Sequence, residues 1–318
     1  MKKAFLHLPF RAFAAAFIMI LAVHTAHAAS ERSAIVREAD QAYYQGRVDK
    51  SLELYQKAIR ENPRDASAHL SLGVTYAEQG EMDKAIESLK KAAELDSKNS
   101  QVFVDLSIAY LEKEDYDRAV TFAKKAVSLD PKRGSTYHAL GLAYEGAGEV
   151  TRALETYKKG AEMDPKNSDL HLTLGNLYGR QNDFKESAKS YEAAIRTNPK
   201  NTYAYCNIAY VYQELGRDDK AIEYLERAKE MDPKDAVVWY DLGAAFTKTG
   251  DIDKAILNYE KSLQLNPKNY KACLSLAIAH ENKRNLEKAA EYYVQAMSLT
   301  DDPRLKETIL RRVTRASE

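Results

Sequence analysis

Cysteine and tryptophan are rare in this chain, and it has no excess of charge of either sign. Its 318 residues include two cysteines and one tryptophan, and 47 basic residues balance 47 acidic ones. With so few cysteines, and with the histidines spread along the chain, the sequence offers no cluster of the kind that holds a metal ion. The balance of charge argues against a nucleic-acid partner, which would require a basic surface.

Long hydrophobic runs are scarce as well. One uninterrupted apolar run, Ala12–Val23, falls short of the roughly 20 residues that a membrane-spanning helix needs. It is preceded by basic residues and followed by a small-x-small sequence that ends at Ala28. The basic residues are Lys2, Lys3 and Arg11. We therefore expect a bacterial signal peptide over residues 1–28.

This signal predicts a periplasmic or secreted protein with no stable membrane insertion after the signal is removed. The alternative is an uncleaved N-terminal segment that anchors the chain in the inner membrane.

Proline is infrequent, but its positions are regular. Five of the eight prolines follow one another at intervals of 34 residues, and Pro63 lies two intervals before the first of them. The five are Pro131, Pro165, Pro199, Pro233 and Pro267. A fixed period of this length indicates a repeat array, in which each repeat contacts only its neighbours.

With proline at position 32, eight repeats follow one another without insertion. They cover residues 32–65, 66–99, 100–133, 134–167, 168–201, 202–235, 236–269 and 270–303. The seventh has the clearest pattern, formed by Trp239, Leu242, Gly243, Phe246, Gly250, Ala255, Tyr259 and Pro267. This pattern resembles the tetratricopeptide repeat, and the resemblance covers all eight repeats.

The resemblance implies an all-α fold, a right-handed superhelical solenoid of eight helix-turn-helix units. We expect these units over residues 29–303 and a C-terminal capping helix over residues 304–318. Small residues at positions 8 and 20 should let the two helices of a repeat approach closely, and glycine at position 15 should end the first helix in a left-handed conformation. Three repeats depart from this glycine, with Glu114, Asn182 and Arg284 at that position.

The two cysteines are predicted to remain unpaired. Cys206 and Cys273 lie almost two periods apart, or roughly 20 Å for stacked helices, whereas a disulfide needs Cα atoms within about 7 Å. We interpret them as small apolar residues inside the solenoid.

The resemblance also implies that the first helices line a concave groove, with positions 2, 5, 6, 9, 12 and 13 directed into it. In the second and third repeats these positions include Val74, Asp105, Ile108 and Glu112. The fifth to seventh repeats combine tyrosines with amide and charged side chains. We predict a groove that binds a protein or peptide there, formed by Asn176, Arg180, Tyr203, Asn207, Tyr210, Gln213, Tyr240 and Lys248.

Some members of this family hold a C-terminal carboxylate between lysine, arginine and asparagine side chains. Asn176 and Asn207 match the two asparagines of that clamp, but Leu172, Val237 and Asp241 stand where cations are required. We therefore expect no carboxylate capture of that kind. The two asparagines could instead pin a peptide backbone, or they could be solvated groove residues.

No catalytic motif is present, and we predict neither an enzyme nor a cofactor. Of the four histidines outside the signal, His69, His171 and His280 occupy expected core positions, and none of the four forms a metal motif. The leading hypothesis is an exported adaptor that binds a partner protein in its groove, with a role in envelope assembly. Two alternatives remain open, a self-assembling structural protein and a protein that binds peptidoglycan or another glycan. The oligomeric state is left open too.

Overall fold

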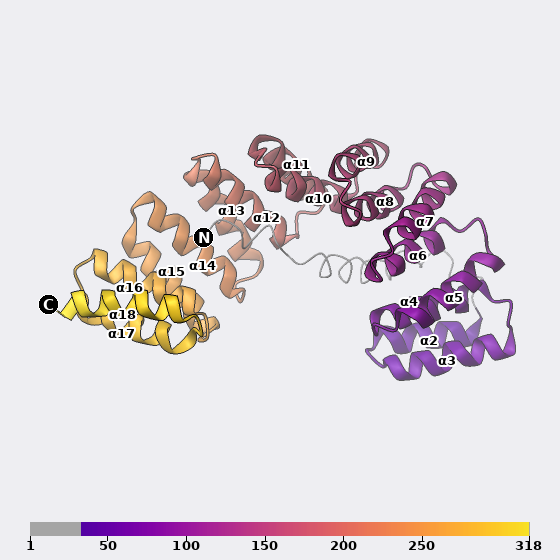
Figure 1. Cartoon of the computed structure of the whole chain (residues 1–318), viewed down its shortest axis with the longest axis horizontal. Helices are drawn as coiled ribbons and strands as arrows, with labels where there is room; N and C mark the ends of the chain where they lie inside the picture. Colours follow the sequence, from indigo (N-terminus) through magenta and orange to yellow (C-terminus); the bar gives the residue numbers. More distant parts are fainter. Residues whose placement is uncertain (1–32, 318) are drawn as a thin grey trace. The chain divides into compact units, whose positions relative to one another are not determined.

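The computed structural model describes residues 33–317, and the predicted signal peptide lies outside them. These described residues form helices α2 to α18 and no strand (Figure 1). The first eight helices are α2 (Ala34–Tyr44), α3 (Val48–Glu61), α4 (Ala66–Glu78), α5 (Met82–Leu95), α6 (Ser100–Glu112), α7 (Tyr116–Leu129), α8 (Gly134–Gly146) and α9 (Val150–Met163). The others are α10 (Ser168–Arg180), α11 (Phe184–Thr197), α12 (Thr202–Glu214), α13 (Asp218–Met231), α14 (Ala236–Thr249), α15 (Ile252–Leu265), α16 (Tyr270–Asn282), α17 (Leu286–Leu299) and α18 (Pro303–Ser317).

The chain divides into two compact parts, and the division falls within α10, between Leu174 and Gly175. Within the N-terminal part, α2 to α9 pack as consecutive neighbours, and so do α11 to α18 within the C-terminal part. The predicted all-α helical repeat solenoid is thus confirmed. Among the described residues, no helix combines the length and the apolar character needed to cross a bilayer.

The two helices of a repeat meet where a small residue at position 8 faces a large one at position 24. A Cβ atom added at Gly73 would lie 2.7 Å from Leu89 Cγ, and one added at Gly175 would lie 2.7 Å from Tyr191 Cδ1. Real Cβ atoms do not approach other atoms so closely. Glycine at position 8 therefore lets the large side chain at position 24 of the second helix pack directly on the backbone of the first.

A left-handed residue at position 15 ends the first helix of every repeat. Glycine fills this position in five repeats, with φ between 70° and 86°. Glu114, Asn182 and Arg284 take the same conformation in the other three, with φ of 58–61°. The repeats therefore keep one turn geometry even where glycine is missing, at a local conformational cost.

Successive repeats are joined by a short turn whose polar side chains replace missing backbone hydrogen bonds. In the turn before α14, Asp232 Oδ1 accepts from Lys234 N at 3.1 Å, and Asp235 caps the helix by accepting from Val237 N at 2.8 Å. The Trp239 indole donates to the Pro233 carbonyl at 2.9 Å. The ring nitrogens of His69 and His171 make the same contact with Pro63 and Pro165, at 3.1 and 3.0 Å.

These contacts correct the prediction that His69 and His171 are core residues. Both side chains are half-buried, because their rings reach sideways to the preceding turn. His280 is buried, as predicted, and stacks on Tyr292. Cys206 and Cys273 are buried free thiols.

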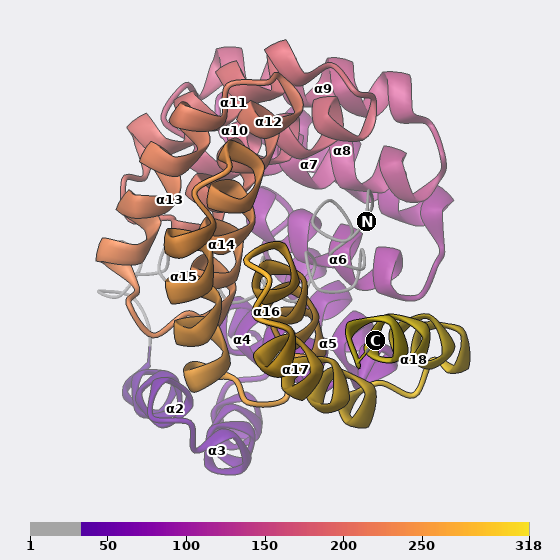
Figure 2. The same cartoon turned by 90° about the vertical axis from the view of Figure 1, so that its left-hand side faces the viewer.

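The last helix, α18, packs against α17 (Figure 2). Ile309 is fully buried in the cluster around Tyr293, and Leu305 and Val313 pack beside it. Arg312 Nη1 donates to Glu281 Oε2 at 3.0 Å and to the Tyr293 hydroxyl at 3.3 Å. These contacts cover the apolar side of the eighth repeat.

Candidate functional site

All eight predicted groove residues belong to the C-terminal part and come from three first helices, α10, α12 and α14. Tyr203, Asn207 and Tyr210 stand at spacings of four and three along α12, so they share one side of that helix. Asn176 and Arg180 are related in the same way on α10. We call the surface formed by the eight residues the first-helix face.

The centre of the first-helix face is a pair of buried amides. Asn176 and Asn207 are only 5% and 3% exposed, and Asn207 Nδ2 lies 3.4 Å from Asn176 Oδ1. The same oxygen accepts from the Tyr191 hydroxyl at 2.5 Å. In this arrangement both neighbours donate to Oδ1, and Nδ2 of Asn176 takes part in neither hydrogen bond. This buried Nδ2 has no hydrogen-bond partner among the described residues.

Two tyrosines and one arginine surround this amide pair. Burial raises the pKa of Tyr191 well above its usual value, and the nearby Arg180 and Asn207 oppose the rise. Burial also raises the pKa of Tyr203, again opposed by Asn207 and Arg180. Both hydroxyls therefore stay protonated at neutral pH, as uncharged groups able to donate and accept hydrogen bonds.

The other predicted residues of α12 and α14 lie in separate surroundings. Burial and the neighbouring Glu214 raise the pKa of half-buried Tyr210. The Lys248 ammonium donates to the Gln213 carbonyl at 2.5 Å and lies 2.8 Å from Asp218 Oδ1. Lys248 is thus engaged within the chain, where it ties the end of α14 to α12 and α13.

Tyr240, on α14, lies beside Tyr259 of α15. Its ring centre lies 5.5 Å from that of Tyr259, and burial raises the pKa of its hydroxyl. On the same helix, burial and the nearby Asp235 raise the pKa of Asp241 to about 8. Burial followed by these same two acids raises the pKa of the Cys206 thiol, which is therefore protonated and weakly nucleophilic at neutral pH.

The structure thus brings together Asn176, Asn207, Tyr203 and Arg180, and it adds Tyr191, which the sequence did not single out. The hydrogen bond of Tyr191 follows an arrangement that recurs in other repeats. A tyrosine at position 24 sends its hydroxyl to a polar side chain at position 9 or 12 of the same repeat. The other examples are Tyr55 with Asp40, Tyr157 with Glu145, Tyr259 with Thr247, and Tyr293 with Glu281.

The described residues contain no group of three or more histidine, cysteine, aspartate or glutamate side chains placed to hold a metal ion. Around the amide pair, the first-helix face instead combines the neutral donors and acceptors of Asn176, Asn207 and Tyr203 with the charge of the nearby Arg180. Such a set can make hydrogen bonds and apolar contacts with an extended polypeptide.

Comparisons with protein families identify the repeat. Five models, each described as a tetratricopeptide repeat, match the chain between residues 36 and 307. Only residues 168–171 and 270–271 within that range lie outside the matches. The matched segments are 36–100, 76–142, 134–167, 172–236, 236–269 and 272–307.

Comparison with solved structures gives the same fold at low sequence identity. A chain of the APC/C hetero-tetramer Cut9–Hcn1 aligns with a TM-score of 0.54 and 16% identity over 89% of this chain. This chain spans only 55% of that one. PilF of Pseudomonas aeruginosa aligns with a TM-score of 0.55 and 19% identity, over 67% of this chain and 96% of its own length. None of the curated proteins compared with this chain is significantly similar to it.

Proposed function

We infer the function of this chain from the family to which it belongs, the tetratricopeptide-repeat family. Members of this family are generally non-catalytic scaffolds of protein–protein interaction. We propose that this chain is an exported adaptor that holds a partner protein on its first-helix face. The proposed ligand is an extended segment of the partner. Its backbone carbonyl would accept from Asn176 Nδ2, and its side chains would lie between Tyr203 and Tyr210.

One observation carries this assignment: the amide nitrogen of Asn176 is buried and has no partner among the described residues. A buried polar group without a hydrogen bond typically costs about 1–3 kcal/mol. This free-energy cost arises at the amide nitrogen of Asn176, and the hydrogen bonds from Asn207 and Tyr191 hold the amide in one orientation. A peptide carbonyl would remove the cost on binding.

The pattern of residues 1–28 supports export, and the compartment suggests a role in assembling the bacterial envelope. Cell fractionation followed by mass spectrometry of the mature N-terminus tests this part. A periplasmic or secreted chain that begins at Ala29 is the expected result. An intact N-terminus in the membrane fraction would support the alternative of an uncleaved anchor.

The binding face is tested by photo-crosslinking in the native cell. A photoreactive phenylalanine at Tyr203 should capture the partner, and the same group at Leu257, which is 65% exposed on α15, is the matched control. The captured protein is then purified, and its affinity for single variants is measured. Asn176→Ala and Asn207→Ala should each weaken binding about tenfold, which corresponds to about 1.4 kcal/mol.

Asn282→Ala, at an exposed position of α16, should leave this affinity unchanged. Unchanged affinity of both Asn176→Ala and Asn207→Ala would rule out the first-helix face as the binding site. Capture of this chain alone would favour the self-assembling alternative.

A further inference from the structure

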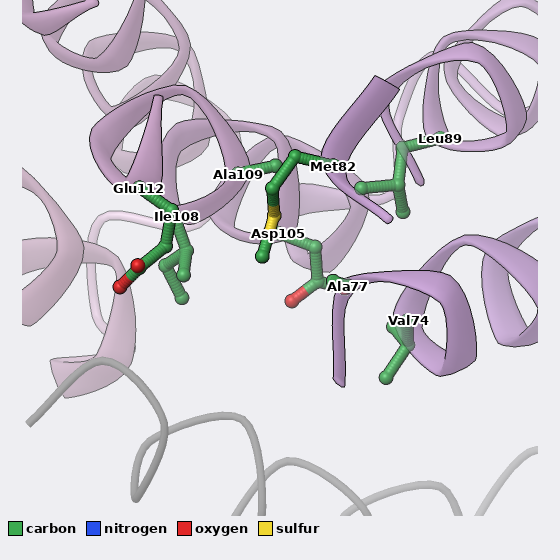
Figure 3. A pocket seen from close by; sticks show the side chains of 8 residues that line it. All are labelled: Val74, Ala77, Met82, Leu89, Asp105, Ile108, Ala109 and Glu112. Carbon is green, nitrogen blue, oxygen red and sulfur yellow. The ribbon is translucent and has the colours of Figure 1, made fainter. Parts of the chain in front are cut away.

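The N-terminal part contains an open hollow between α4, α5 and α6. Its walls are mainly apolar, with Val74 from α4, Met82 from α5 and Ile108 from α6 among them. Among the described residues of the lining, the charged ones are two acids of α6, Asp105 and Glu112. Figure 3 shows the Asp105 side chain in the middle of the lining, with Met82 beside it and the Glu112 carboxylate to one side.

Asp105 is held in place through one of its two oxygens. Its Oδ1 accepts from Gln101 Nε2 at 2.9 Å, and Gln101 Oε1 in turn accepts from Arg133 Nη2 at 2.7 Å. Its Oδ2 is buried and has no hydrogen-bond partner among the described residues. Asp105 as a whole is only 8% exposed. The relay from Arg133 through Gln101 therefore fixes the carboxyl group and leaves one oxygen for a ligand.

A buried carboxyl with one open oxygen favours a cationic donor over other ligands. Burial raises the pKa of Asp105 to about 7, because the charged form is poorly solvated there, and Gln101 and Arg133 offset only part of this effect. An ammonium group at Oδ2 would compensate the buried charge. Glu112 adds negative charge to the same lining, and none of the described residues that line it is basic.

The geometry distinguishes lysine from arginine. A guanidinium group binds a carboxylate best through two parallel hydrogen bonds, which need both oxygens. Here Oδ1 is committed to Gln101, so one oxygen remains. Lysine carries a compact charge on a four-carbon stem, and the apolar walls would contact that stem.

We propose that this hollow binds a lysine side chain of the partner protein, with the ammonium group on Asp105 Oδ2 and the stem between Val74, Met82 and Ile108. The inference rests on the proposed function, because it assumes a partner polypeptide. It adds a second contact site in the N-terminal part and states a chemical requirement for the partner.

The test uses defined peptides and the full-length purified chain. Four acetylated and amidated nonapeptides differ only at the central residue, which is lysine, norleucine, acetyl-lysine or arginine. Binding is measured from NMR shifts of labelled Val74 and Ile108 methyl groups. The lysine peptide should bind at least tenfold tighter than the norleucine and acetyl-lysine peptides and tighter than the arginine peptide. Asp105→Asn should abolish this preference.

Asp83→Asn changes an exposed acid on α5 and should keep the lysine preference. Val74→Phe fills the hollow and should weaken binding of all four peptides, so the proposal is also tested independently of the change at Asp105. Equal binding of the lysine and norleucine peptides would overturn the proposal, as would an undiminished lysine preference in Asp105→Asn. Tighter binding of the arginine peptide would overturn the choice of lysine.

Failure of this test is distinguishable from failure of the proposed function. The peptide measurement needs no natural partner and does not involve the first-helix face. A lysine preference that depends on Asp105 would stand even if the changes at Asn176 and Asn207 had no effect on partner binding.

Discussion

The Tyr259 ring lies on the backbone of Gly243, so close that a Cβ atom at Gly243 would be 2.5 Å from Tyr259 Cδ1. Tyr259 is 3% exposed, and its hydroxyl lies 3.1 Å from Thr247 Oγ1, so the ring has little freedom to move aside. Close contact between α14 and α15 therefore depends on the missing side chain.

We expect Gly243→Ala to destabilise the seventh repeat by about 1–2 kcal/mol. Overpacking a core typically costs about 1–3 kcal/mol, and the better helix propensity of alanine returns up to about 1 kcal/mol. Hydrogen exchange of α14 and α15 measures the change, because a solenoid can open locally. Adding Tyr259→Leu should recover part of the loss, since the sixth repeat pairs Ala209 with Leu225 at these positions. Unchanged protection in Gly243→Ala would contradict the packing argument.

The left-handed turn of the eighth repeat gives the opposite kind of prediction. Arg284 has φ of 58°, a conformation that costs a residue with a side chain roughly 1–2 kcal/mol. Arg284→Gly should therefore stabilise the eighth repeat by about 0.5–1 kcal/mol, after the larger entropy of glycine in the unfolded chain is counted. Hydrogen exchange of α16 and α17 provides the measurement. Gly80→Ala is the reverse control: a Cβ there meets nothing within 4 Å, so its loss of stability reports the backbone conformation alone.

The fold could be predicted from the sequence because one physical pattern is repeated eight times. Gly73, Gly175 and Gly243 each stand sixteen residues before the large residue that covers them, so a single repeat already reveals the helix contact. The recurring hydrogen bond of the tyrosine at position 24 could also have been predicted from the sequence. The sequence places Tyr191 fifteen residues after Asn176 and Tyr55 fifteen after Asp40, and both pairs form hydrogen bonds.

The candidate site was harder to predict, because it depends on contacts between repeats. Lys248 was expected in the groove, yet it pairs with Asp218, thirty residues earlier. Lys113 with Asp83 and Lys283 with Asp253 have the same separation. A spacing of thirty is one period less one helical turn, which brings the end of a first helix beside the start of the preceding second helix. Whether an amide nitrogen lacks a hydrogen-bond partner among the described residues, as in Asn176, depends on side-chain directions that spacing does not give.

The capping helix supplies a prediction with a matched control. Ile309 is fully buried against Tyr293, whereas the next residue, Leu310, is 54% exposed. From the sequence alone, Ile309 and Leu310 are both predicted to belong to one apolar stripe with Leu305 and Val313, and the structure corrects this prediction for Leu310. Ile309→Ala should cost about 2–5 kcal/mol and release α18, which would lower hydrogen-exchange protection in α17. Leu310→Ala should change stability by no more than about 0.5 kcal/mol. Equal effects of the two changes would contradict the packing of α18.

Asp105 predicts a pH dependence of the N-terminal part. Its pKa is raised to about 7 in the folded chain, from a usual value of 3.8. Between these values the folded state binds more protons than the unfolded state, so the contribution of Asp105 to stability falls as pH rises from about 4 to about 7. A shift of this size corresponds to at most about 4 kcal/mol. Above pH 7 the contribution is constant.

Asp105→Asn removes this titration, and the difference between variant and wild type isolates it. The comparison is needed because burial lowers the pKa of His138 to about 4, which makes the folded chain lose stability on acidification from about 6.5. The variant should match the wild type near pH 4 and be more stable by up to about 4 kcal/mol at pH 8. Hydrogen exchange of α6, corrected for the intrinsic rate at each pH, measures the difference. A difference that is independent of pH would show that the buried carboxyl is not the titrating group, whereas Asp83→Asn should produce no such change.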